Sequence, residues 1–266
     1  MGVQIALTIA GSDSGGGAGI QADLKTFQQF GVFGTSAVVA VTAQNTLRVT
    51  GVHTVPPDTV RAQVEALASD LPPAAVKSGM LATGELVEVV AELLTRYRFP
   101  NYVCDPVMMA TSGDRLLDRD AERSIQRSLL PLAAVVTPNI DEAAVLVARP
   151  VETIDHMEEA GRALCAMGAG AALVKGGHLA DGDIVDVLVT AETVHRYAHP
   201  RLNTTSTHGT GCTLSAAVTA GLALGYDIPA AVERALGFVH RAMADAPGLG
   251  SGHGPLNHLV AATEAG

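Results

Sequence analysis

Four consecutive residues in the C-terminal third of the chain have the types needed to hold a phosphate group: Gly209, Thr210, Gly211 and Cys212. The two glycines allow the backbone to turn tightly, so that successive N–H groups converge on an anion at the N-terminus of the helix that follows. Such a group of amides stabilises the charge that develops on a phosphoryl group during its transfer. We expect the helix dipole to lower the pKa of the Cys212 thiol, which could then take a proton from a substrate hydroxyl. The alternative is a glycine-rich helix start with a structural cysteine.

A second set of polar residues could serve a nucleotide and its metal ion. Asn139 and Glu142 are one helical turn apart and face the same side of a helix. They could hold Mg²⁺, which usually binds through few carboxylates together with phosphates. Alternatively, Asn139 is an N-cap and Glu142 completes a capping box. Lys175 ends an apolar run before two glycines, where it could reach a phosphate or simply lie in solvent.

The glycine-rich segment at residues 11–19 is a weaker indication of nucleotide binding. It lacks the Lys-Ser/Thr ending of a P-loop. Residues 17–22 fit the GxGxxA dinucleotide pattern, but no Asp or Glu lies between Leu24 and Pro57, where the ribose-binding acid should follow. We therefore expect a loop whose backbone approaches a compact ligand, or a mobile flap, and not the loop of a dehydrogenase.

These residues need a scaffold, which the alternation of short apolar runs with amphipathic segments predicts. We expect strands at residues 3–10, 35–42, 74–77, 102–104, 133–136 and 171–174. We expect helices at residues 18–30, 58–71, 84–98, 118–130, 140–148 and 155–167, with Asp58 and Asp118 as N-caps. Most of the strands are continuous apolar runs, as expected when both faces of a sheet are covered. The pattern predicts an α/β fold with a mostly parallel sheet and helices on both faces.

The pattern changes in the last third of the chain. Residues 184–190 and 193–198 predict a late antiparallel strand pair, and helices are expected at 211–224 and 228–244, with a short helix closing the chain. Polar clusters follow five of the strands, at residues 11–13, 44–45, 105–106, 137–139 and 175–177. Because ligands of open α/β sheets collect at the carboxyl ends of strands, we expect one site along this edge.

Composition and charge narrow the class of protein. The chain has 266 residues, of which 48% are hydrophobic, and we expect a single domain over residues 1–266. The net charge of −10 argues against a nucleic-acid partner. Three scattered cysteines and the absence of a signal-peptide pattern predict a cytoplasmic setting. Residues 203–226 carry no charge, but their apolar part is too short for a membrane span.

Several motifs, taken together, resemble those of one family. They are AGSDSGGGAGIQAD at 10–23, VTAQN at 41–45, KSGM at 77–80, DPVM at 105–108, TPNIDE at 137–142, KGGH at 175–178, THGTGC at 207–212 and GHGP at 252–255. The chain thus resembles, from end to end, the hydroxymethylpyrimidine/phosphomethylpyrimidine kinases of thiamine biosynthesis, within the ribokinase-like superfamily. The resemblance implies that ATP phosphorylates 4-amino-5-hydroxymethyl-2-methylpyrimidine, a pyrimidine alcohol, and then its monophosphate. It also suggests a homodimer.

The resemblance further implies roles for individual residues. Gln44 would bind the edge of the pyrimidine ring, because its amide offers both a donor and an acceptor. The remaining substrate-binding residues would be Gly11, Ala18, Asp23, Met80 and Val107. The Mg²⁺-linked acids would be Asp105 and Glu142, and the ATP contacts Lys175, Thr207 and Asn139. Many ribokinase relatives have an Asp as the base where this chain has Cys212.

Two other functions stay open. A pyridoxal or pyridoxine kinase of the same superfamily would share the site at 209–212, but we expect an apolar residue in place of Gln44 there. A non-catalytic protein that binds a phosphometabolite would not need Lys175, Asp105, Glu142 and Cys212 together. Formation of ADP that depends on the added pyrimidine alcohol would distinguish these functions.

Overall fold

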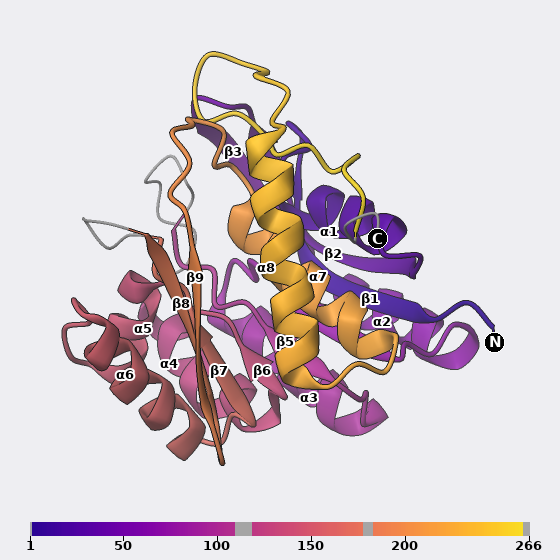
Figure 1. Ribbon diagram of the computed structural model, residues 1–266. Coiled ribbons are helices and arrows are strands. Elements are labelled where there is room, and N and C mark those ends of the chain that lie inside the picture. Colours follow the sequence, from indigo (N-terminus) through magenta and orange to yellow (C-terminus); the bar gives the residue numbers. More distant parts are fainter. Residues whose placement is uncertain (1, 110–118, 178–182, 263–266) are drawn as a thin grey trace.

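The computed structural model describes residues 2–109, 119–177 and 183–262, and in these ranges one nine-stranded sheet runs through the molecule (Figure 1). The order of strands is β3-β2-β1-β4-β5-β6-β7-β8-β9. The strands are β1 Ile5–Asp13, β2 Phe33–Gln44, β3 Val49–Thr54, β4 Ala75–Ser78, β5 Tyr102–Cys104, β6 Val135–Val136, β7 Ala171–Val174, β8 Ile184–Thr190 and β9 Val194–His199. In the spatial order of the sheet, all neighbouring strands from β2 through β1 to β7 are parallel. Strand β3 at one edge, and β8 and β9 at the other, are antiparallel to their neighbours.

Helices cover both faces of the sheet, as the sequence predicts. They are α1 Gly19–Gln29, α2 Pro57–Asp70, α3 Gly84–Tyr97, α4 Arg119–Ser124, α5 Ile140–Val147, α6 Ile154–Ala166, α7 Thr210–Ala223 and α8 Ile228–Ala244. Alternate residues of the strands face opposite layers: Ala6 packs in the layer of α1, α7 and α8, and Leu7 packs in the layer of α2 and α3. The predicted mostly parallel sheet with a late antiparallel pair is therefore confirmed.

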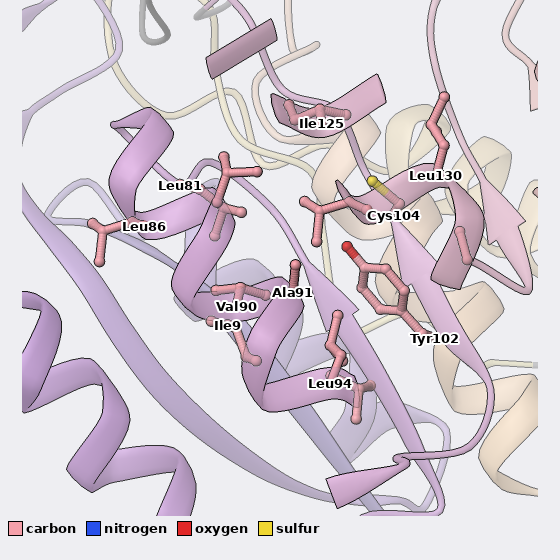
Figure 2. Close-up of a cluster of buried hydrophobic side chains, with 14 of the residues drawn as sticks. Ile9, Leu81, Leu86, Val90, Ala91, Leu94, Tyr102, Cys104, Ile125 and Leu130 are labelled. Carbon is pink, nitrogen blue, oxygen red and sulfur yellow. The ribbon is translucent and has the colours of Figure 1, made fainter. Parts of the chain in front are cut away.

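The core under α3 shows why the long apolar runs form buried strands. Figure 2 shows Val90 and Leu94 of α3 in one cluster with Ile9 of β1 and Tyr102 of β5. A third cluster joins α5 and α6 to β7 and β8. Side chains from both faces therefore hold the carboxyl ends of the parallel strands in fixed relative positions.

Four local features differ from the predictions. Strand β3 was not expected, because its residues are largely exposed at the sheet edge and carry no apolar alternation. Asp58 is not the N-cap of α2: Pro56 takes that position and Pro57 begins the helix. The helix expected at 118–130 changes after α4 to a π-helical turn, Ile125–Leu129, and then to a 3-10 turn (Asp118 lies outside the described residues). The described part of the C-terminus, up to residue 262, forms turns instead of a short helix.

Helix α7 lies between the sheet and α8, which crosses in front of it in Figure 1. From Thr213 to Ala223 every side chain of α7 is buried, so the uncharged segment is a core helix. None of the helices described is both long and apolar enough to span a bilayer. The N-terminus of α7 faces the carboxyl ends of the parallel strands, because Ser215 of its first turns contacts Asp105 just after β5.

Candidate active site

The strand order reverses between β1 and β4, which is where open α/β sheets hold their ligands. The last residues of β1 and the loop after β4 are joined by a hydrogen bond from the N–H of Gly11, inside β1, to the carbonyl of Met80, 3.1 Å long. A Cβ on Gly11 would overlap the methyl group of Met80, so a larger residue at this position would have to displace the Met80 side chain. Gly11 and Met80, both predicted to bind substrate, therefore lie side by side at the switch point.

The carboxylate of Asp13 organises the glycine-rich loop that follows β1. It accepts hydrogen bonds from the N–H groups of Gly15, Gly17 and Ala18, at 2.8, 3.0 and 2.9 Å. Burial alone would raise the pKa of the Asp13 carboxyl, but hydrogen bonds from His208, Ala18 and Gly15 outweigh it and hold the pKa below its ordinary value. The loop is thus a fixed turn around a buried negative charge, and Ala18 has a defined place in it.

His208 connects this loop to the start of α7. Its Nε2 lies 2.8 Å from Oδ2 of Asp13, and both side chains are buried. The backbones also touch, since a Cβ on Gly209 would collide with the carbonyl oxygen of Gly17. The same Nε2 of His208 lies 3.5 Å from Nε2 of Gln44 at the end of β2. The expected substrate side and phosphate side of the site therefore meet at His208.

The start of α7 has the form of an anion-binding turn. Gly209 is the N-cap in the left-handed region (φ 85°), and Thr210 Oγ1 donates to the carbonyl of Thr207 at 3.0 Å. Thr213 N–H bonds back to Gly209, whereas the N–H groups of Gly211 and Cys212 find no acceptor among the described residues. Free amides in a first helical turn are ready donors for a phosphate oxygen.

The Cys212 thiol differs from expectation. Burial raises its pKa to about 11, and the charge of Lys77 only partly offsets this. The predicted lowering by the helix dipole is therefore wrong, because the loss of solvent outweighs the favourable dipole. The backbone N–H of Gly19, at the start of α1, lowers the pKa of the thiol slightly but does not offset burial.

Lys175 lies between two buried carboxylates. Its Nζ is 3.5 Å from Oδ1 of Asp105 and 3.9 Å from Oε2 of Glu142. Burial alone would lower the pKa of Lys175, but Asp105 and Glu142 outweigh it and raise the pKa, so the ammonium group stays charged. A Cβ on Gly211 would lie 3.3 Å from this Nζ, which places the lysine beside the free amides of α7.

Asn139 and Glu142 form the capping box that was the alternative to a metal site. Asn139 Oδ1 accepts from Glu142 N–H, and Glu142 Oε2 accepts from Asn139 N–H, both at 2.8 Å. Burial raises the pKa of Glu142; Lys175 pulls it back, and Asp105 raises it further. The cap fixes the Glu142 carboxylate toward Lys175, so a structural role and a role in the site are compatible.

The acidic residues suit Mg²⁺ only together with phosphate oxygens. In the ranges that the structure describes, no three or more His, Cys, Asp or Glu side chains gather as a metal site. Asp105 and Glu142 are two carboxylates around one ammonium group, and Mg²⁺ usually binds through one or two carboxylates with substrate phosphates and water. The donor set therefore fits a metal that arrives with a nucleotide.

Three further predicted residues lie around this centre. Asp23 is completely buried in α1, where its carboxylate meets Lys77 and Thr8 at 2.6 Å each. Val107 is partly buried, and its N–H bonds to the carbonyl of Asp105. Thr207 Oγ1 contacts His253 Nδ1 at 3.3 Å.

Sequence reasoning gave no role to Lys77, His208 or Ser215. Lys77 and His208 stood inside motifs that were quoted only as family markers. Ser215 Oγ donates to Asp105 Oδ2 at 3.0 Å, and its place one turn after Gly211 in an uncharged helix was the signal that could have found it.

Comparisons with known proteins agree with this geometry. A family model described as phosphomethylpyrimidine kinase matches residues 13–257. A hydroxymethylpyrimidine/phosphomethylpyrimidine kinase of Bacillus subtilis is 47% identical over 98% of this chain and 96% of its own length. The Escherichia coli protein of the same name is also 47% identical, over 96% and 97%.

Solved structures of related kinases have the same fold as this chain. An ADP complex of Bacillus subtilis pyridoxal kinase superimposes with a TM-score of 0.90 at 37% identity, covering 97% of this chain and 98% of the other. A phosphomethylpyrimidine kinase from Clostridium difficile has a TM-score of 0.81 at 41% identity, covering 90% and 99%. The predicted ribokinase-like fold and the resemblance drawn from the motifs are both confirmed. This chain belongs to the phosphomethylpyrimidine kinase family.

Proposed function

We propose that this chain transfers the γ-phosphoryl group of ATP to 4-amino-5-hydroxymethyl-2-methylpyrimidine, and then a second phosphoryl group to the resulting monophosphate. The observation that carries the proposal is the contact between Gln44 and His208, because it joins an amide suited to an aminopyrimidine edge to the residue that precedes the anion-binding turn. The names of the curated relatives support the same reaction.

The residues at the start of α7 would carry the transfer itself. The substrate hydroxyl attacks the γ-phosphorus, the bond from the γ-phosphorus to the bridging oxygen breaks, and ADP leaves. The N–H groups of Gly211 and Cys212 would stabilise the charge on the transferring oxygens. Cys212 accepts the hydroxyl proton. Its pKa of about 11 in the free protein means that the thiol holds its own proton at neutral pH. It can act as a base only after it has lost that proton to solvent, and the positive charges of Lys77 and Lys175 would then stabilise the thiolate.

Lys175 would hold the phosphates on the side opposite the substrate. Its ammonium group lies beside Gly211, so it can bridge to the oxygens that the amides bind. Asp105 and Glu142 would hold Mg²⁺, which, when bound, neutralises phosphate charge.

A cavity next to Thr207 would take the rest of the nucleotide. It has a volume of about 520 Å³, and its lining includes Leu202, Ser206, Met243 and Gly248. Ser206 directly precedes Thr207, so the cavity adjoins the anion-binding turn. Thr207 and Asn139 keep their predicted roles as nucleotide contacts in this proposal.

Production of ADP from Mg-ATP tests the proposal. We expect ADP only when the pyrimidine alcohol or its monophosphate is added, with the diphosphate as final product by mass spectrometry. Turnover of pyridoxine without turnover of either pyrimidine would overturn the choice of substrate and leave the kinase assignment in place.

Pyridoxal or pyridoxine phosphorylation is the second candidate. The observation in its favour is the TM-score of 0.90 with a pyridoxal kinase. Gln44 argues for the pyrimidine, because a site built for paired hydrogen bonds rejects a ring that leaves those groups unpaired. The homodimer and the cytoplasmic setting stay predictions, and sedimentation of the purified chain would test the homodimer.

A further inference from the structure

Lys175 stands where β7 separates from β8. Strand β7 ends at Val174, which pairs with Val187 of the antiparallel strand β8. One step further in the same register, Lys175 would lie opposite Asp186, and directly opposite residues of an antiparallel pair have their side chains on the same face of the sheet. The Asp186 side chain is buried, and the transfer proposed above gives it no role.

The carboxylate of Asp186 holds the backbone that immediately follows Lys175. Its Oδ1 accepts a hydrogen bond from the N–H of Gly176 at 2.8 Å, and Gly176 is buried. The two backbones are also in contact there, because a Cβ on Gly176 would collide with the carbonyl oxygen of Val185. The N–H of Lys175 itself donates to the carbonyl of Pro138 at 2.9 Å. The main chain is therefore fixed on both sides of Lys175.

The hydrogen bond to Gly176 accounts for the place of Asp186 better than its other contact does. Oδ2 of Asp186 lies 4.0 Å from Nε2 of His199, too far for a hydrogen bond. A buried N–H group that loses its acceptor destabilises the local backbone, which then moves toward another partner. Gly176 therefore needs an oxygen at the position of Asp186 Oδ1.

The position of Lys175 Nζ depends on this part of the backbone. It lies between Asp105 and Glu142, beside the first turn of α7, so a shift of the main chain would move the ammonium group away from the free amides. We propose that Asp186 is a positioning residue that fixes Lys175 through the N–H of Gly176, so that the ammonium group meets the phosphates of the nucleotide. This inference rests on the proposed function, in which Lys175 holds those phosphates.

The affinity for an inert ATP analogue with Mg²⁺, measured by calorimetry, tests the inference without an acceptor substrate. Asp186→Leu removes the oxygen acceptor, and we expect the affinity to fall by about tenfold or more, because a misplacement of about 1 Å can cost up to about 100-fold. Asp186→Asn keeps an oxygen for Gly176 and should stay within about threefold of the wild type.

The other end of β8 provides a matched control. Thr190 Oγ1 accepts a hydrogen bond from the N–H of Thr193 at 3.0 Å, so this side chain also holds a backbone turn next to the strand. Thr190→Val removes that acceptor away from Lys175. It should keep the wild-type affinity for the analogue.

A double-mutant cycle shows whether Asp186 acts through Lys175. Lys175→Met removes the ammonium group, and we expect it to lower the affinity by about tenfold or more. In this background Asp186→Leu should cost less than about twofold further, because there is no longer a lysine to misplace. If Asp186 only stabilised the fold, the two losses would multiply.

A second variant displaces the same turn while Asp186 stays in place. The methyl group of Gly176→Ala would collide with the carbonyl of Val185, so we expect this variant to lower the affinity by about tenfold as well, again only when Lys175 is present. It carries the test if Asp186→Leu does not fold, as judged by its thermal unfolding.

The outcomes separate this inference from the proposed function. If the wild type binds the analogue but forms no ADP with either pyrimidine, the proposed function fails, and the cycle still decides the role of Asp186. The positioning role is wrong if folded Asp186→Leu or Gly176→Ala keeps the wild-type affinity, or if the losses multiply in the Lys175→Met background. Wild-type affinity in Lys175→Met, or an Asp186→Asn variant as weak as Asp186→Leu, would also overturn it.

Discussion

Nζ of Lys77 lies 2.6 Å from Oδ1 of Asp23, and both side chains are entirely shielded from solvent. The pair joins β4 to α1 directly beneath the site, where Thr8 also donates to the Asp23 carboxylate. Burial alone would lower the pKa of Lys77, but the charges of Asp23 and Asp105 and the hydrogen bond to Asp23 outweigh it and raise the pKa. The lysine therefore stays charged and extends the positive field under the N-terminus of α7.

Lys77→Met should destabilise the protein severely, because it leaves the Asp23 carboxylate buried without its partner. We expect a loss of about 3–5 kcal/mol in the free energy of unfolding, measured with urea. Arg61→Met is the matched control: it breaks an ion pair with Glu92 in which both side chains are partly exposed, and it should cost less than about 1 kcal/mol. Equal losses in the two variants would show that burial does not decide the strength of the Lys77 pair.

Cys212→Ala should lower kcat much more than it weakens ATP binding. If the thiol is the base, kcat falls by about 100-fold or more, while the affinity for an inert ATP analogue, measured by calorimetry, changes little. Cys165→Ala, on α6 at the far side of the sheet, is the control and should retain wild-type kcat. Near-normal kcat in Cys212→Ala would remove the thiol from the base role and leave the transfer to the backbone amides.

The two ends of α7 provide a direct comparison for its anion-binding turn. Gly209 and Gly225 have nearly the same left-handed φ, 85° and 88°, but only Gly209 is in contact with the glycine-rich loop. Gly209→Ala should lower kcat by about 100-fold or more, because the new methyl group displaces the turn and its free amides. Gly225→Ala should cost only about 1 kcal/mol of stability and keep its activity. A Gly209→Ala variant with full activity would contradict the role of the turn.

His258 should make stability depend on pH. Its Nε2 lies 2.9 Å from Oγ1 of Thr213 in the first turns of α7, and burial lowers its pKa to about 4. The unfolded chain has the ordinary value of about 6.5, so the unfolded state binds the proton more tightly and stability is lost as the pH falls from about 6.5 toward 4. Between pH 7 and pH 5 this group alone should remove about 2 kcal/mol from the free energy of unfolding.

Urea unfolding at the two pH values checks this result. His258→Gln keeps a polar group without titration, so its loss of stability between pH 7 and pH 5 should be smaller than that of the wild type. The same pH dependence in both proteins would assign the effect to other groups.

The sequence patterns predicted most strands of the sheet correctly, but they predicted few of the contacts within the site. Apolar runs such as Tyr102–Cys104 and Ala171–Val174 form strands at the expected residues, because burial on both faces dictates their composition. Strand β3 escaped prediction because it is an exposed edge strand that β2 holds by backbone hydrogen bonds. The pattern of side chains contains no trace of such a strand.

The site was predicted as a set of residues but not as a network. The clusters at strand ends showed that Asp105 and Lys175 would gather at one edge, and they lie 3.5 Å apart. Two pairs could not be foreseen: Lys77 with Asp23, and His208 with Asp13, are separated by 54 and 195 residues. The pKa of Cys212 was mispredicted for the same reason, since distant segments bury the thiol and their effect outweighs that of its own helix.

The choice of substrate is tested most directly by kcat/KM for the pyrimidine alcohol and for pyridoxine, in the wild type and in Gln44→Leu. We predict that the wild type prefers the pyrimidine, and that Gln44→Leu loses about 100-fold or more with the pyrimidine while its activity with pyridoxine changes little. A wild type that phosphorylates pyridoxine at least as well as the pyrimidine, with no loss of pyrimidine turnover in Gln44→Leu, would contradict the account.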